Sequence, residues 1–187
     1  MTKIKICGLK RPEDIQAVNE AKPDFAGFVI EVSKSRRNVS AEQVRELVKG
    51  LAEQTEAVGV FVNAPLELVA GLLKDGTLAL AQLHGGEDEA YIRELRQMTD
   101  KPLIQAFSIR TKADIERALQ STADYLLLDQ GDGGTGRCFD WSLVPELSSP
   151  FFLAGGLSVV NLSEAISQVK PWAVDLSSSL ETDGVKD

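Results

Sequence analysis

The sequence is poor in the residues that build metal sites and disulfide frameworks. Its 187 residues include one histidine, His84, and two cysteines, Cys7 and Cys138, which lie far apart in the chain. Zinc sites and disulfide scaffolds need clustered cysteine or histidine at set spacings. We therefore expect reduced thiols, no metal and a cytoplasmic protein.

Long apolar runs and an excess of basic residues are also missing. No stretch approaches the roughly 18 apolar residues of a membrane span, and the N-terminal ten residues lack the apolar core of a signal peptide. The formal net charge is −8, whereas binding to nucleic acid or an anionic membrane requires clustered lysine and arginine. We expect no nucleic-acid or membrane partner.

The residues that are present alternate between short apolar runs and longer amphipathic stretches. With 43% hydrophobic and 26% charged residues, the composition is that of one globular domain over 1–187. The pattern predicts eight strands, at Lys3–Cys7, Phe25–Val29, Ala57–Val62, Ala79–Leu83, Leu103–Phe107, Tyr125–Asp129, Phe151–Ala154 and Ala173–Leu176. It predicts intervening helices at Pro12–Glu20, Ser40–Leu51, Pro65–Lys74, Glu87–Met98, Thr111–Gln120 and Asn161–Lys170, with a short one near Trp141–Glu146.

Repeated strand–helix alternation indicates an α/β fold with a parallel sheet, and eight strands allow closure into a (β/α)8 TIM barrel. The alternative is an open doubly wound sheet, but Gly8, Leu9 and Lys10 after the first strand do not form its dinucleotide fingerprint. No amphipathic stretch follows the eighth strand before Asp187. The barrel is therefore expected to lack its final helix, leaving Val174 and Leu176 without a cover.

Active sites of such barrels lie at the carboxyl ends of the strands. Alternation along the first strand places Lys3, Lys5 and Cys7 on one face and the apolar Ile4 and Ile6 on the other, so Cys7 points into the barrel mouth. The same reasoning turns Asp129 inward. A thiol and a carboxyl facing each other suit a proton-transfer pair, although a lone cysteine is as often a small core residue and a strand-end aspartate a cap.

Other candidates follow the remaining strands: the basic cluster Lys34–Arg37, His84, the glycine-rich segment Gly131–Gly136, Gly155 and Gly156, and Asp175 with Ser177–Ser179. Taken singly, each has an ordinary structural explanation, such as a solvated loop or a tight turn. In barrels, however, the last two loops often bind phosphate through backbone N–H groups. The two glycines and the serines stand where such a phosphate site would lie.

Several of these motifs occur together in one family. The chain resembles the phosphoribosylanthranilate isomerases of tryptophan biosynthesis from residue 3 to residue 187. The motifs that carry the resemblance are Lys5–Gly8, Lys34–Ser40, Gly59–Asn63, Gln82–Gly85, Leu127–Asp129 with Gly133–Gly136, Phe139–Trp141, Ala154–Leu157 and Asp175–Ser178.

The resemblance implies a cofactor-independent Amadori rearrangement of a phosphorylated small molecule, N-(5-phosphoribosyl)anthranilate, to the 1-deoxyribulose phosphate. It implies that Cys7 is the general base and Asp129 the general acid. Arg37, rather than its neighbour Arg36, would pair with the anthranilate carboxylate. By the same resemblance His84 and Asp175 line the pocket, and Gly155, Gly156 and Ser177 contact the phosphate.

The chain departs from the family pattern in three places. Ser179 stands where the family usually has glycine, so strain is expected there. Residues 30–34 are less aromatic than the family's corresponding segment, and the last helix of family members has no counterpart before Asp187. These departures leave room for an inactive truncated form.

Other phosphate-binding barrels, of the indole-glycerol-phosphate synthase or histidine-pathway isomerase type, are further alternatives that Cys7 disfavours. The sequence is compatible with a monomer or a weak homo-oligomer.

Overall fold

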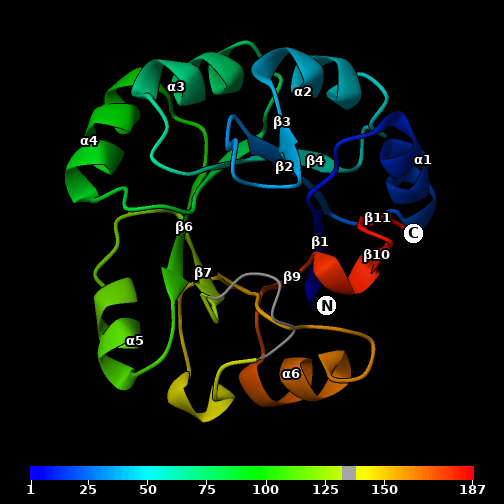
Figure 1. Ribbon diagram of the computed structural model, residues 1–187. Coiled ribbons are helices and arrows are strands. Elements are labelled where there is room, and N and C mark those ends of the chain that lie inside the picture. The colour runs from blue at the N-terminus through cyan, green and yellow to red at the C-terminus, as the bar shows by residue number, and fades with distance from the viewer. Residues whose placement is uncertain (132–137) are drawn as a thin grey trace.

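The chain forms a closed parallel barrel in a computed structural model that describes residues 1–131 and 138–187. Eight strands make up the ring, in the order β1, β9, β8, β7, β6, β5, β4, β2, and β1 closes it by pairing with β2 (Figure 1). Their bounds are Lys3–Cys7 (β1), Phe25–Ile30 (β2), Glu56–Phe61 (β4), Leu80–Leu83 (β5), Leu103–Ser108 (β6), Tyr125–Asp129 (β7), Phe151–Leu153 (β8) and Ala173–Leu176 (β9). All eight predicted strands are confirmed, with ends within one residue.

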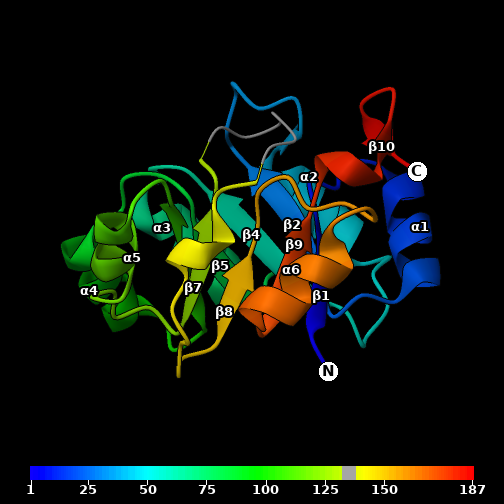
Figure 2. The ribbon, with the colours of Figure 1, turned by 90° about the horizontal axis from the view of Figure 1, so that it is seen from below.

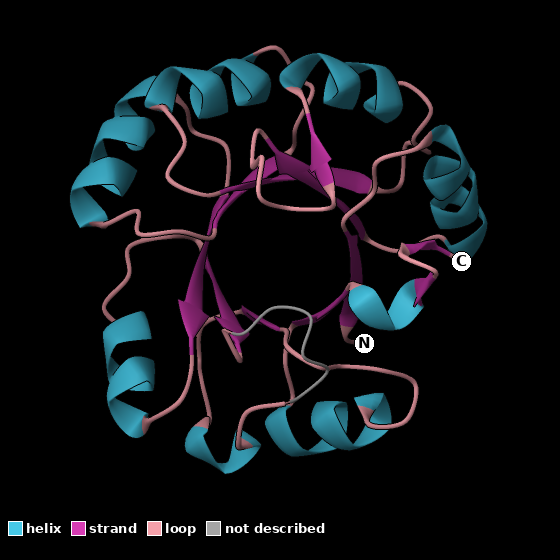
Figure 3. Cartoon of the chain, viewed as in Figure 1, coloured by secondary structure: helices cyan, strands magenta, loops and turns pink. Residues whose placement is uncertain are grey.

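Helices surround the ring on its outside (Figure 3). They are α1 (Pro12–Ala21), α2 (Ala41–Val48), α3 (Leu66–Lys74), α4 (Glu89–Met98), α5 (Lys112–Ala118) and α6 (Leu162–Val169), with a short 3₁₀ turn η1 at Trp141–Leu143 between β7 and β8. A capping box begins α2, because Ser40 Oγ accepts the N–H of Gln43 and Gln43 Oε1 accepts the N–H of Ser40.

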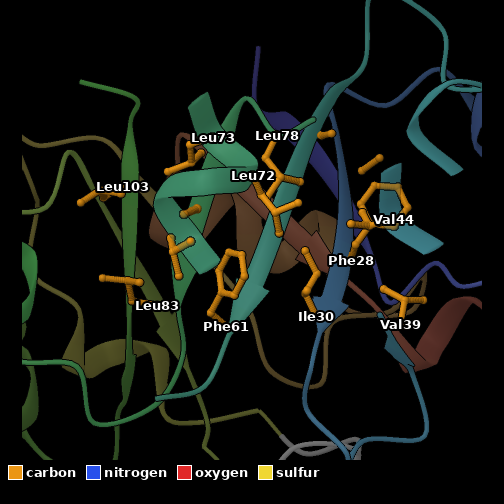
Figure 4. Close-up of a cluster of buried hydrophobic side chains, with 14 of the residues drawn as sticks. Phe28, Ile30, Val39, Val44, Phe61, Leu72, Leu73, Leu78, Leu83 and Leu103 are labelled. Atoms are coloured by element: carbon orange, nitrogen blue, oxygen red, sulfur yellow. The ribbon is translucent and has the colours of Figure 1, made fainter. Parts of the chain in front are cut away.

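Two apolar layers hold the barrel together. Inside the ring, Phe25, Leu80, Ile104, Leu127 and Phe152 form an apolar interior layer. Outside it, the apolar faces of the helices pack on the strands, and Figure 4 shows one such cluster between β2, β4 and α3. The strands are thus buried on both faces, which explains their nearly continuous apolar sequences.

The chain after β9 folds back against α1 in a form that the sequence did not predict. A 3₁₀ turn η2 (Ser178–Leu180) leads into a small antiparallel hairpin of β10 (Glu181–Thr182) and β11 (Val185–Lys186), and Figure 1 shows it between β1 and α1. A further short strand, β3 (Asn38–Val39), pairs with the end of β2.

The expectation that the outward side chains of the eighth barrel strand, β9, are uncovered is wrong. Val174 is 0% and Leu176 is 7% exposed, in one cluster with Leu180 and Ile166. The turn η2 and helix α6 thus shield the outer face of β9. The strain expected at Ser179 is also absent, because this residue lies in η2 and is not among the described residues with positive φ.

Among the described residues, the helices are all too short or too polar to cross a bilayer. Of the glycine-rich segment Gly131–Gly136, the part after Gly131 lies outside the described residues.

Candidate active site

The loops that follow the strands gather at one end of the barrel, opposite the N-terminus (Figure 2). They surround a cavity of about 260 Å³. Its lining includes all eight residues to which the family resemblance assigns a role: Cys7, Arg37, His84, Asp129, Gly155, Gly156, Asp175 and Ser177. Val29, Val32, Val60, Val62 and Leu157 give it an apolar wall. The site therefore combines opposite charges and a thiol with an apolar surface.

Cys7 ends β1 and points into this cavity, as the alternation predicted. Its side chain is 8% exposed, and it pairs in register with Gly27 of β2. A Cβ on Gly27 would stand 2.8 Å from the Cys7 sulfur, so only glycine leaves room for the thiol. Ser177 Oγ donates a hydrogen bond to the Cys7 carbonyl at 3.0 Å, which ties the strand end to the loop after β9.

Asp129 ends β7 and faces His84, which follows β5. The two side chains approach at 3.5 Å between His84 Nε2 and Asp129 Oδ2. On the other side of the ring, Gln82 Nε2 lies 2.7 Å from His84 Nδ1. Because an amide N–H₂ can only donate, Nδ1 accepts and the ring proton sits on Nε2, directed at Asp129. Gln82 therefore fixes the tautomer in which His84 donates to the carboxylate.

These contacts decide the charge of Asp129. Burial alone would raise the pKa of this carboxyl, but the hydrogen bond from His84 and the N–H groups of Gln130 and Gly131 lower it below its ordinary value of 3.8. Gly155 packs against the same group, because a Cβ there would stand 2.7 Å from Asp129 Oδ1. Its φ of +86° is one that other residues rarely adopt. Gly155 thus shapes the space around Asp129 as well as the loop after β8.

Arg37 reaches the cavity across Gly8. A Cβ on Gly8, whose φ is +91°, would lie 2.3 Å from Arg37 Cδ, so glycine here lets the arginine stem lie flat on the backbone. The guanidinium donates from Nε to Glu181 Oε1 at 2.6 Å and from the outer nitrogen to Oε2 at 3.1 Å. Arg36 contacts the same carboxylate at 2.7 Å, but its side chain is 58% exposed, against 18% for Arg37.

Glu181 is the centre of a cluster that fastens the C-terminal hairpin to the site. Besides both arginines it accepts Lys186 Nζ at 3.0 Å, and the same ammonium donates to the Ser177 carbonyl at 2.8 Å. Burial would raise the pKa of Glu181, but its hydrogen bonds to Arg37 and Lys186 lower it from 4.5 to about 2.

The shifted pKa of Glu181 makes stability depend on acid pH. A depressed carboxyl pKa contributes stability that is complete above about pH 4.5 and is lost as the pH falls towards 2. We expect Glu181→Gln to lower the free energy of unfolding at pH 7 by up to about 3 kcal/mol. It should also flatten the pH dependence between pH 4.5 and 2 in urea titrations.

The control is Asp183→Asn, which removes an exposed carboxyl from the same hairpin at a positive φ that asparagine tolerates. An equal loss of stability in both variants, or an unchanged acid titration in Glu181→Gln, would show that the cluster does not stabilise the fold.

The loops after β8 and β9 form a further part of the cavity lining. Gly155 and Gly156 have φ of +86° and +65°, and Asn161, the residue before α6, holds this loop by donating to the Gly156 carbonyl at 3.0 Å. Ser177 and Ser178 line the same cavity. Glycine backbone and serine hydroxyls next to a helix start are groups that bind phosphate.

Sequence reasoning missed four polar residues of this site. Lys5 pairs with Asp175 at 2.8 Å, and Gln82 holds His84. Both carried a signal, because each lies two residues before a candidate on the same strand face. Glu181 and Lys186 carried none, since their partners are set by how the hairpin folds back.

Comparison with known proteins shows the family of this chain. The model of the N-(5'phosphoribosyl)anthranilate (PRA) isomerase family matches residues 4–187. A relative named N-(5'-phosphoribosyl)anthranilate isomerase, from Endomicrobium trichonymphae, is 47% identical over 192 residues, covering 100% of this chain and 93% of its own length.

Solved structures agree with this assignment. The phosphoribosyl anthranilate isomerase of Thermotoga maritima superimposes with a TM-score of 0.90 at 36% identity, covering 100% of this chain and 93% of that one. A further phosphoribosyl anthranilate isomerase, solved in complex with reduced 1-(o-carboxyphenylamino)-1-deoxyribulose 5-phosphate, gives 0.85 at 34% identity with coverages of 100% and 93%. These likenesses extend along the whole chain.

Proposed function

We propose how this chain, which belongs to the N-(5'-phosphoribosyl)anthranilate isomerase family, carries out its isomerisation in tryptophan biosynthesis. The substrate is N-(5-phosphoribosyl)anthranilate, and the product is 1-(2-carboxyphenylamino)-1-deoxyribulose 5-phosphate. The observation that carries the proposal is that Cys7 and Asp129 line one cavity from β1 and β7. A base and an acid are thereby available to one ligand.

In the proposed reaction Asp129 donates a proton to the ribose ring oxygen as the C1–O bond breaks and the C1–N imine forms. The Cys7 thiolate then takes the proton from C2, and the electron pair of that C–H bond gives an enolamine. Tautomerisation of the enolamine to the ketone completes an isomerisation in which no atom is lost and no electron transferred. Each proton transfer of this kind contributes about 10²–10⁴-fold to a rate.

The resting protonation of the two groups is the reverse of what this reaction needs. Burial raises the pKa of Cys7 above its ordinary value of 9.0, while the pKa of Asp129 is lowered. The free site therefore holds a thiol and a carboxylate. The phosphate and carboxylate of a bound substrate add negative charge, which favours protonated Asp129. Groups near Cys7 must favour its thiolate.

Recognition of the substrate divides between two parts of the cavity lining. We propose that Arg37 pairs with the anthranilate carboxylate, because a guanidinium fork fits a carboxylate. The valines of β2 and β4 give its ring an apolar surface. Gly155, Gly156 and Ser177 would hold the phosphate, and His84 and Asp175 would line the pocket beside the substrate.

Replacing Arg37 by alanine is expected mainly to raise KM. The lost charge-assisted contact is worth about 1.5–3 kcal/mol, or roughly 10–150-fold. Glu181 keeps Arg36 and Lys186 as partners, so the hairpin should stay attached. Steady-state kinetics of Arg37→Ala beside Arg36→Ala provide the measurement. An equal or larger effect from Arg36→Ala would show that Arg36, and not Arg37, contacts the carboxylate.

The activity is tested directly by the fluorescence of phosphoribosylanthranilate, which should decay faster than its spontaneous rate when the purified chain is added. Binding of the reduced product analogue without any turnover would instead show a phosphate-binding barrel that is catalytically inactive. We further propose a cytoplasmic enzyme with a small phosphorylated substrate, working as a monomer or weak homo-oligomer. Its place in amino-acid biosynthesis and its two free thiols support the location.

A further inference from the structure

Lys5 is an unusual residue for the interior of a barrel. Its side chain is completely buried, although lysine is almost never fully buried without a partner. The partner is Asp175 on the neighbouring strand β9, in register with Lys5, with 2.8 Å between Lys5 Nζ and Asp175 Oδ2. The inner layer beside this pair is made of apolar side chains such as Phe25, Leu80 and Phe152.

The ion pair is a poor explanation for stability. The free energy needed to remove two charges from water is about as large as the free energy gained from their attraction. Replacing a buried ion pair by apolar side chains of similar volume often leaves a protein equally stable or more stable. Asp175 Oδ1, moreover, has no hydrogen-bond partner among the described residues. A buried pair that leaves an acceptor unused is better explained by chemistry in the cavity that Asp175 lines.

The chemistry next to Lys5 is that of Cys7. The two residues lie on one face of β1, two positions apart, and Asp175, which holds the Lys5 ammonium at 2.8 Å, lines the same cavity as Cys7. Asp175 on β9 and Lys186 on β11 are the other charged groups that act on this sulfur. Arg37, His84 and Asp129 complete the titratable lining of the cavity.

We propose that Lys5 is a positioning residue that supplies the fixed positive charge for the Cys7 thiolate, and that Asp175 holds its ammonium in place. This inference rests on the proposed role of Cys7 as general base. It explains how a thiol buried at a strand end reaches the ionised form that takes a proton from C2. Asp175 orients the ammonium, although its own negative charge disfavours the nearby thiolate.

The electrostatics support this division of roles by their signs. Burial raises the pKa of Cys7, the Lys5 charge and hydrogen bond lower it, and the Asp175 charge raises it. Asp175 and Cys7 in turn raise the pKa of Lys5 against the opposing effect of its burial, which keeps the ammonium charged. Removing Lys5 should therefore raise the pKa of Cys7, whereas removing Asp175 should lower it.

The test measures the ionisation of Cys7 without using turnover. In a Cys138→Ser background, which leaves one thiol, the rate of alkylation by iodoacetamide is followed against pH. Lys5→Met, which keeps the volume and removes the charge, should move the midpoint at least one unit to higher pH and slow alkylation about tenfold below it. Asp175→Asn should move the midpoint to lower pH. Lys5→Arg should restore most of the original midpoint.

Kinetics give a second readout. Lys5→Met should lower kcat at neutral pH about tenfold or more while KM changes less than threefold. Midpoints that move in the same direction in both variants, or that stay within 0.3 units of the parent, would overturn the proposal. Should Lys5→Met fail to fold because it leaves a buried carboxylate unpaired, the double variant Lys5→Met/Asp175→Asn is compared with Asp175→Asn, and its alkylation midpoint should lie at higher pH.

The two proposals fail separately. If Cys7→Ala keeps its turnover while the alkylation midpoints shift as expected, Lys5 tunes the thiol but the thiol is not the base. If Cys7→Ala is inactive and the midpoints do not shift, the thiol is the base but Lys5 is not its counter-charge.

Discussion

Replacing Cys7 by alanine is expected to lower kcat by about 10²–10⁴-fold, because the site then has no group to take the proton from C2. Substrate affinity should stay within about tenfold, since Arg37 and the loops after β8 and β9 are untouched. The fold should also persist, because the change removes one sulfur atom at a strand end. Stopped-flow turnover and equilibrium binding of the reduced product analogue measure the two effects separately.

The matched control is Cys138→Ala, which removes the second thiol from outside the cavity lining. It should keep the parental kcat. Retention of more than a tenth of the parental kcat by Cys7→Ala would contradict the assignment and leave Cys7 as a packing residue beside Gly27.

Replacing Asp129 by asparagine is the second large effect expected, again about 10²–10⁴-fold in kcat. The amide keeps the shape of the carboxyl, and its oxygen can still accept the His84 Nε2 proton, so the geometry of Gln82, His84 and residue 129 should survive. What is lost is the proton for the ring oxygen. Steady-state kinetics of Asp129→Asn at neutral pH test this role.

His84→Asn is the informative companion to Asp129→Asn. It removes the group that holds Asp129 ionised, so the carboxyl should remain a competent acid and kcat should fall much less. A parental kcat in Asp129→Asn would make Asp129 structural. A larger loss in His84→Asn than in Asp129→Asn would transfer the acid role to the histidine.

The strands and the placement of the candidate residues could be predicted from the sequence because both depend on local patterns. A buried parallel strand is a short apolar run, and the alternation of side chains decides which residues face inward. That reasoning correctly turned Cys7 and Asp129 into the same cavity. It also placed Lys5 on the inner face, although the sequence named no partner for it.

The fold of the segment after β9 could not be predicted from local sequence patterns. The absence of an amphipathic stretch predicted an uncovered strand, yet η2 and α6 cover Val174 and Leu176. A 3₁₀ turn and a two-residue hairpin strand are too short to leave a periodic signal. Their position is fixed by contacts with distant residues, above all those of Glu181.

By itself, then, the sequence determined the eight strands, the helices between them and the strand ends that carry Cys7 and Asp129. Only the tertiary structure decided the pairs that join distant positions: Lys5 with Asp175, 170 residues apart, and Arg37 with Glu181, 144 residues apart. The physical reason is ring closure. When β1 pairs with both β2 and β9, the first strand meets the last, and no spacing along the chain records which of their charged side chains will touch.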